Sequence, residues 1–294
     1  MALNTNNQAK AFILLTILAL IWGTSFILMK RGLLVFSAGE VGSLRVASAS
    51  LFLLPVALAN LRGLDRKHYA KLFTSGLIGI FFPAFLFAMA QTKLESSVTG
   101  IMNSLTPICT LLIGVWFFNQ HFRKASIIGI IIGLIGTVIL VIAKSDGRIG
   151  GINVYAVFVI LACVFYALNL NFIKYKIREL NALTITSVSL LLIGPLAFLY
   201  LFGFTEFTHK LTAVDGAWRA FGYIMVLGFM STCLATIIFN VLVKISSPLF
   251  TSSVTYLIPI VAVLWGLFDG EQLYPGHFIG MLAIFMGVYL ANRK

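Results

Sequence analysis

Polar side chains recur at helical spacing inside stretches of the chain that are otherwise apolar. Thr99, Asn103, Thr106 and Thr110 follow one another at intervals of three or four residues, which places them on one face of a helix. Asn103 offers an amide donor and an acceptor, and the nearby Pro107 removes a backbone donor and loosens the helix. We expect Asn103 and Thr106 to contact a polar solute, although a hydrogen bond between helices is the alternative for any one threonine.

Other polar and aromatic residues of these apolar stretches could line the same site. The further candidates are Trp22, Tyr166, Asn169 and Tyr256. Tyr166 and Asn169 are three residues apart and therefore share a helix face, whereas Trp22 could line the site or only pack beside it. Similar stripes, which indicate surfaces that face protein or a cavity and not lipid, occur at Thr232, Thr236 and Asn240 and at Thr251 and Thr255.

Arg45 is the only charged residue inside the first nine apolar stretches, and the tenth contains only His277. A guanidinium in such a place could anchor a carboxylate of a bound solute through paired hydrogen bonds. The alternative is a structural cation that reaches the membrane interface or pairs with Glu40.

The sequence lacks the groups that a membrane-embedded enzyme or a metal centre requires. Neither a carboxylate pair nor an HExxH motif occurs inside the apolar stretches. Cys109, Cys163 and Cys233 lie in separate stretches without CxxC spacing, and we expect them to act as small apolar side chains. We therefore predict no catalytic residue, no metal site and no cofactor. If the protein carries a solute across a membrane, the missing acids also favour flux that follows the substrate gradient over proton-driven transport.

Ten long apolar runs supply the elements that position these side chains. The chain of 294 residues is 60% hydrophobic and only 10% charged, which is too apolar for a water-soluble globule. A helix needs roughly 20 apolar residues to cross about 30 Å of hydrocarbon. The runs of suitable length are 11–29, 41–61, 72–92, 96–118, 125–143, 152–173, 182–204, 220–243, 247–268 and 274–291. They predict an all-α polytopic membrane protein with ten transmembrane helices.

The lysines and arginines of the loops indicate how these spans are oriented. If both termini are cytoplasmic, the cytoplasmic segments hold about twice as many basic residues as the loops on the other side, as the positive-inside rule expects. The net charge of +12 lies in these loops and not on one extended face, so we predict no nucleic-acid partner. The first run has no obvious small-residue cleavage site, which favours a retained span over a signal peptide.

The fourth and ninth spans carry matching landmarks, which indicates an internal repeat. Pro107 and Pro259 each follow a small, polar run, and we expect both to act as hinges. The sequence therefore predicts two five-helix halves, residues 1–147 and 148–294. Because five is an odd number, the second half enters the membrane upside down relative to the first, as is typical of secondary transporters.

Glycines extend the repeat and mark the spans that pack closely. The spacing of Gln120, Gly129 and Gly136 equals that of Glu271, Gly280 and Gly287. Gly129, Gly133 and Gly136 also form one face of the run 125–143. We expect this run and the last one to be close-packing supports or the surface of a homodimer, and not cavity walls.

Short motifs occur in or beside several of the spans. They are IWGTSF in the first span, SLRVA in the second, NSLTP in the fourth, TYLIP in the ninth and GEQL ahead of the tenth. With these motifs the chain resembles the EamA family of the drug/metabolite transporter superfamily over essentially its full length. It departs from the family pattern at Gln120, where a glutamate is frequent, which weakens that position as a functional site. The resemblance implies a bacterial inner-membrane transporter, often an exporter of amino acids or related metabolites.

We therefore expect a secondary transporter in the lipid bilayer that moves a small polar or zwitterionic metabolite outward by alternating access, with amino-acid export as the preferred activity. One alternative is an importer or exchanger of a nucleotide-type or sugar-type compound. Such a transporter would be expected to have several cationic side chains in its cavity. An alternative of another class is an intramembrane enzyme or a lipid-handling protein.

Overall fold

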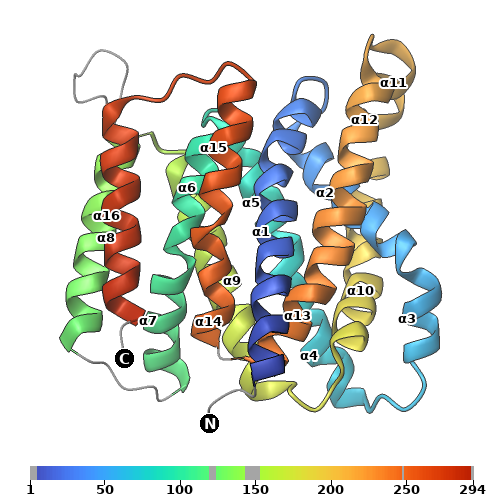
Figure 1. Ribbon diagram of the computed structural model, residues 1–294. Helices are drawn as coiled ribbons and strands as arrows, with labels where there is room; N and C mark the ends of the chain where they lie inside the picture. Colours follow the sequence, from blue (N-terminus) through green and yellow to red (C-terminus); the bar gives the residue numbers. More distant parts are fainter. Residues whose placement is uncertain (1–4, 119–123, 143–152, 247, 293–294) are drawn as a thin grey trace.

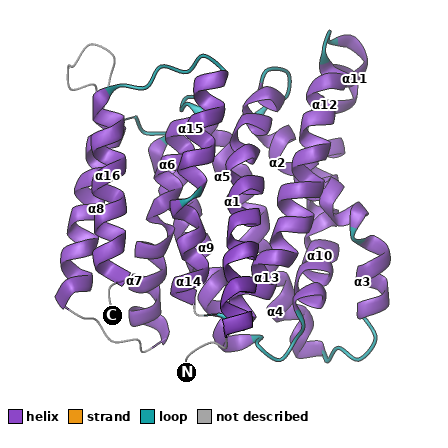
Figure 2. Ribbon diagram, viewed as in Figure 1, coloured by secondary structure: helices purple, strands orange, loops and turns teal. Residues whose placement is uncertain are grey.

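The apolar runs are helices, as predicted. The computed structural model describes residues 5–118, 124–142, 153–246 and 248–292. Within these ranges nearly all residues are helical and none belongs to a β-strand (Figure 2). Gln120 and the predicted boundary between residues 147 and 148 lie outside the described ranges.

Half of the spans are continuous helices and half are interrupted. The continuous ones are α1 (Thr5–Leu33), α8 (Lys124–Ile142), α9 (Ala156–Lys176), α10 (Ala182–Gly203) and α16 (Pro275–Asn292). The interrupted ones are α2 (Ala38–Phe52) with α3 (Leu54–Asn60); α4 (Arg66–Gly76), η1 (Leu77–Phe81) and α5 (Phe82–Gln91); α6 (Ser96–Met102), η2 (Asn103–Leu105) and α7 (Thr106–Phe118); α12 (Ala217–Val226), η3 (Leu227–Leu234) and α13 (Ala235–Ile245); and α14 (Pro248–Ser252), η4 (Ser253–Tyr256) and α15 (Ile258–Phe268). The η1 and η3 segments are π-helical, and η2 and η4 are 3-10 helical.

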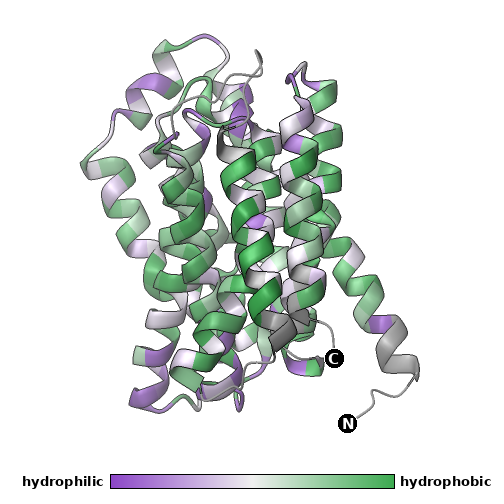
Figure 3. Cartoon of the chain, turned by 90° about the vertical axis from the view of Figure 1, so that its left-hand side faces the viewer, coloured by the Kyte–Doolittle hydropathy of each residue, from purple (hydrophilic) through white to green (hydrophobic). Residues whose placement is uncertain are grey.

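These helices account for the ten predicted spans. Among the described residues, seven helical segments are long and apolar enough to cross a membrane, and α2 with α3 forms a further one that bends by 59°. The α8 and α16 helices contain the two remaining, shorter apolar segments. Hydrophobic residues cover the helices between two more hydrophilic ends (Figure 3). The all-α, ten-helix membrane fold is thereby confirmed. We call the end where α1 begins and α16 ends the terminal end, and the opposite end the distal end (Figure 1).

Both predicted hinge prolines leave a carbonyl that another side chain satisfies. Proline has no N–H, so the carbonyl four residues earlier lacks its usual helical donor. The Asn103 carbonyl, four residues before Pro107, accepts from Thr106 Oγ1 at 2.8 Å. The Thr255 carbonyl, four residues before Pro259, accepts from Ser104 Oγ at 2.8 Å. The hydroxyls of Thr106 and Ser104 therefore keep these buried carbonyls paired although each helix is interrupted.

The predicted glycine faces lie against each other inside the chain. The α8 and α16 helices pack side by side at one edge of the bundle (Figure 1). A Cβ atom on Gly287 would lie 2.5 Å from the Gly129 carbonyl oxygen and would overlap the Gly133 backbone nitrogen. A Cβ atom on Gly136 would lie 2.8 Å from the Gly280 carbonyl oxygen. These glycines bring the two helices into backbone contact, so they are not free to form a dimer surface, and a homodimer stays a prediction.

A short helix that the sequence does not signal, α11 (Phe207–Ala213), follows α10 in the chain and lies at the distal end beside α12 (Figure 1). Phe207 is buried, and its ring centroid lies 5.5 Å from that of Phe36 in the α1–α2 connection. Lys210 Nζ lies 2.7 Å from Glu40 Oε2 at the start of α2. The α11 helix is thus held against the first two spans by one aromatic contact and one ion pair.

Candidate substrate cavity

A cavity lies among the interrupted helices, where the four non-α segments of the described residues meet. These segments contribute Gly79 and Ile80 of η1, Asn103 of η2, Ser231 and Thr232 of η3, and Val254 and Thr255 of η4. Six of the seven candidate substrate-binding residues also line it, namely Trp22, Arg45, Asn103, Thr106, Tyr166 and Asn169. Because π-helical turns are frequent at functional sites, their place in the cavity wall supports this assignment.

The cavity is the size of a small metabolite. About 70 Å³ of it is open to the centre of a water molecule, and a single water needs roughly 10–15 Å³ by the same measure. It therefore accommodates several waters or one small polar molecule.

Arg45 is the charged residue among those that line the cavity. It is only 7% exposed, and its Nε donates to Thr232 Oγ1 at 2.9 Å. No carboxylate of the described residues pairs with Arg45. Glu40 forms its ion pair with Lys210 instead. The alternative that Arg45 pairs with Glu40 is therefore wrong. A buried cation without a counter-ion is costly, so an anionic group of a ligand would stabilise it.

Asn103 and Asn169 add amide donors to the cavity wall. Asn103 Oδ1 accepts from Thr106 Oγ1 at 3.2 Å, and Asn169 Oδ1 accepts from Ser75 Oγ at 2.7 Å. Within the part of the chain that the structure describes, neither Nδ2 group has an acceptor. Together with the outer nitrogens of Arg45, these groups suit a ligand that is rich in hydrogen-bond acceptors, such as a carboxylate.

Trp22 both packs and lines the cavity. Its Nε1 donates to the Ser231 carbonyl oxygen at 3.2 Å, and its ring centroid lies 5.2 Å from that of Phe239. Sequence reasoning missed Ser231, because in a regular α-helix this residue would lie off the face that carries the threonine stripe. The stripe of Thr232, Thr236 and Asn240 does line the cavity, and it was the sequence signal for this part of the cavity wall.

The two predicted tyrosines occupy different places. Tyr166 lines the cavity, and its ring lies 5.8 Å from that of Phe87. Tyr256 belongs to η4 and packs against the main apolar cluster, but it is not among the residues that line the cavity. A contact between Tyr256 and a substrate stays a prediction.

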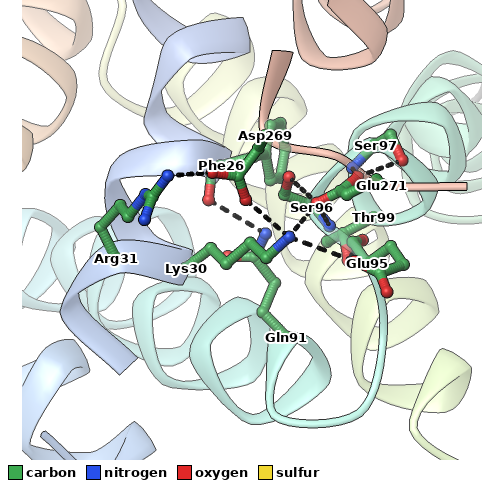
Figure 4. A network of polar contacts seen from close by, with 10 residues as sticks. All are labelled: Phe26, Lys30, Arg31, Gln91, Glu95, Ser96, Ser97, Thr99, Asp269 and Glu271. Atoms are coloured by element: carbon green, nitrogen blue, oxygen red, sulfur yellow. Dashed lines mark hydrogen bonds and ion pairs between the residues drawn. The ribbon is translucent and has the colours of Figure 1, made fainter. Parts of the chain in front are cut away.

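A cluster of charged side chains lies at the distal end of the bundle, and Figure 4 shows it from close by. Lys30 Nζ of α1 lies 2.8 Å from Asp269 Oδ2, 2.8 Å from Glu271 Oε1 and 3.3 Å from Glu95 Oε2. Arg31 also pairs with Asp269. These ion pairs join the end of α1 to the α15–α16 connection, which comes from the other half of the sequence.

Glu271 is the most enclosed acid of this distal cluster, with a side chain only 1% exposed. Its two oxygens accept from the backbone nitrogens of Ser96 and Ser97 at 3.0 Å and from both serine hydroxyls at 2.5 Å (Figure 4). Burial alone would raise the pKa of Glu271, but the hydrogen bonds from Lys30, Ser96 and Ser97 outweigh it and lower this pKa from 4.5 to about 2. Glu271 is therefore ionised at physiological pH. From the sequence, Glu271 was identified only as a landmark of the internal repeat.

The sequence matches a known family in two blocks. Residues 9–142 and 153–293 each match the EamA-like transporter family. The chain belongs to this family. The resemblance seen in the sequence motifs is thus confirmed, and this EamA-like protein is a membrane transporter of that type.

Relatives of similar length include proteins named as transporters. An uncharacterized transporter of Archaeoglobus fulgidus is 24% identical over 286 residues, which cover 97% of this chain and 99% of that protein. The uncharacterized inner membrane transporter YedA of Escherichia coli is 24% identical over 292 residues, which cover 94% of this EamA-like chain and 88% of YedA. A solved crystal structure shares the fold with a TM-score of 0.67 at 17% identity, over 97% of this chain and 96% of that one.

Proposed function

We propose that this EamA-like transporter carries a small polar metabolite with a carboxylate group, of the amino-acid class. The observation that carries the proposal is Arg45, a buried cation that has no acid partner among the described residues and lines the cavity. The amide donors of Asn103 and Asn169 line the same cavity, and the open volume of about 70 Å³ limits the substrate to a small molecule.

We infer alternating access between two inverted halves, residues 1–147 and 148–294. The two family matches, 9–142 and 153–293, support the division. The order of helix interruptions supports it further, because a π-helical segment followed one span later by a 3-10 segment occurs in each half, as η1 and η2 and as η3 and η4. Corresponding helices that bend beside a shared central cavity are what exchange between two equivalent conformations requires.

We further propose a location in the inner membrane with both termini cytoplasmic, and transport in the outward direction. The location is supported by the name of the relative YedA, and the orientation by the excess of basic residues in the segments at the terminal end. The direction rests on the family resemblance alone.

Counterflow in proteoliposomes tests the proposed activity. Vesicles containing the purified protein are loaded with one common L-amino acid at a time, and uptake of the same radiolabelled amino acid is measured against protein-free vesicles. We expect at least one small amino acid to be exchanged and its carboxamide to be rejected, because the amide has no charge for Arg45 to pair with.

Two substitutions assign the residues. Loss of a charge-assisted hydrogen bond of about 1.5–3 kcal/mol should reduce the apparent affinity of Arg45→Gln by roughly tenfold or more, and Asn103→Leu should lose roughly fivefold for a neutral bond of about 1 kcal/mol. Failure of every amino acid to exchange faster than in empty vesicles would overturn the proposed substrate class.

A further inference from the structure

The guanidinium of Arg45 is held by a residue from the other half of the chain. Arg45 lies in α2, within the first family match, and Thr232 lies in η3, within the second. The 2.9 Å bond from Arg45 Nε to Thr232 Oγ1 is the only hydrogen bond of the Arg45 side chain to any residue described here. The two outer nitrogens of the guanidinium therefore remain without an acceptor in the described protein.

The local backbone is shaped for this contact. Gly228 of η3 lies so close to α2 that a Cβ atom there would be 3.1 Å from the Arg45 carbonyl oxygen and would overlap Ser48 Oγ. A π-helical turn holds more residues than an α-helical one, so it changes which side chains face a neighbouring helix. Through this turn, the adjacent residues Ser231 and Thr232 bond to Trp22 and Arg45, which come from two different spans of the first half.

We propose that Thr232 is a positioning residue for the substrate carboxylate. Its hydroxyl fixes Nε and so directs the edge that carries the two outer nitrogens to the cavity, where a carboxylate can accept two parallel hydrogen bonds. This inference rests on the proposed function, since it assumes that Arg45 binds a carboxylate. It adds that the carboxylate subsite is assembled from both halves, so that separation of α2 from η3 would release the guanidinium and weaken the subsite.

Conservative variants of Thr232 test this assignment. Thr232→Val keeps the shape and removes the hydroxyl, Thr232→Ser keeps the hydroxyl, and Arg45→Gln removes the charge. The matched control is Thr137→Val, because Thr137 is also buried but its hydroxyl donates to Gly133 O of its own helix α8, away from the cavity. Each purified variant is titrated with sodium acetate as a minimal carboxylate, with acetamide and sodium chloride as references, and thermal stabilisation gives the dissociation constant.

We expect acetate to stabilise the wild type more than acetamide or chloride does, and Arg45→Gln to abolish the difference. Thr232→Val should bind acetate roughly tenfold more weakly, a loss in the range of one hydrogen bond to a charged group, while Thr232→Ser and Thr137→Val should bind as the wild type does. A merely structural Thr232 would lower the melting temperature without changing the preference for acetate over acetamide.

The outcomes separate the two proposals. If Arg45→Gln loses acetate binding and Thr232→Val does not, the positioning role is wrong and the carboxylate site stands. If acetate does not stabilise the wild type beyond chloride, or if Arg45→Gln binds acetate normally, both proposals fall.

Discussion

The distal cluster allows a quantitative prediction, because two glutamates share Lys30 but differ in burial. Glu271 is 1% exposed and accepts four hydrogen bonds from Ser96 and Ser97, whereas Glu95 is 52% exposed and lies 3.3 Å from Lys30 Nζ. Glu271→Gln keeps the shape but replaces one acceptor oxygen by an NH2 group. That change leaves one backbone N–H and one hydroxyl facing a donor.

The expected loss follows from these contacts. Each buried donor left without an acceptor costs about 1–3 kcal/mol, but a serine hydroxyl can rotate to another partner. Together with the weakened ion pair to Lys30, this should lower the free energy of unfolding of Glu271→Gln by roughly 2–4 kcal/mol. For Glu95→Gln we expect a loss of about 0–1 kcal/mol, as for an exposed ion pair.

The assay is unfolding of the purified protein, titrated from mild detergent micelles into sodium dodecyl sulfate and followed by circular dichroism. Glu95→Gln is the matched control, since it also removes one negative charge that pairs with Lys30. Equal losses for the two variants, or a loss below about 1 kcal/mol for Glu271→Gln, would show that burial and serine contacts do not determine the strength of this cluster.

Three more predictions concern pH, packing and topology. Because the pKa of Glu271 is lowered from 4.5 to about 2, its stabilising contribution should be fully present above pH 4.5 and lost as the pH falls toward 2, so wild type but not Glu271→Gln should lose it in acid unfolding experiments. Gly287→Ala should destabilise the protein in the same detergent assay, because its methyl group would overlap the Gly133 backbone, whereas Gly222→Ala, with nothing within 4 Å of its added carbon, should be neutral or stabilising; equal effects would contradict the packing account. In intact cells, a membrane-impermeant thiol reagent should label Asp215→Cys at the distal end and not Arg62→Cys at the terminal end, and the reverse pattern would overturn the proposed orientation.

Sequence reasoning found the spans because their length is set by the bilayer and not by details of packing. The run 182–204 coincides almost residue for residue with α10, and 96–118 has the same limits as α6, η2 and α7 together. The bend after Phe52 and the π-helical turns were not predicted, since they depend on how neighbouring helices fit together. Gly228 illustrates this dependence, because its close contact with Ser48 of α2 cannot be inferred from the sequence around it.

The candidate site was predictable in its residue types but not in its pairings. The rule that buried polar groups face protein or a cavity identified Trp22, Asn103 and Asn169 from local sequence alone. The partner of Arg45 could not be found in this way. Glu40 was the nearby acid in the sequence, but Lys210 of the unpredicted helix α11 pairs with it, and Thr232 bonds to Arg45 from a distant span.

The lone charge of the cavity also has an electrical consequence. Because no acid of the described residues pairs with Arg45, the empty cavity carries one positive charge; a bound monoanion cancels this charge, and a bound zwitterion does not. A unit charge that crosses a membrane potential of 100 mV changes in energy by about 2.3 kcal/mol. If Arg45 crosses part of that field when the halves exchange conformations, the return of the empty carrier is sensitive to voltage. The voltage dependence of the conformational exchange with substrate bound then shows whether the substrate is an anion or a zwitterion.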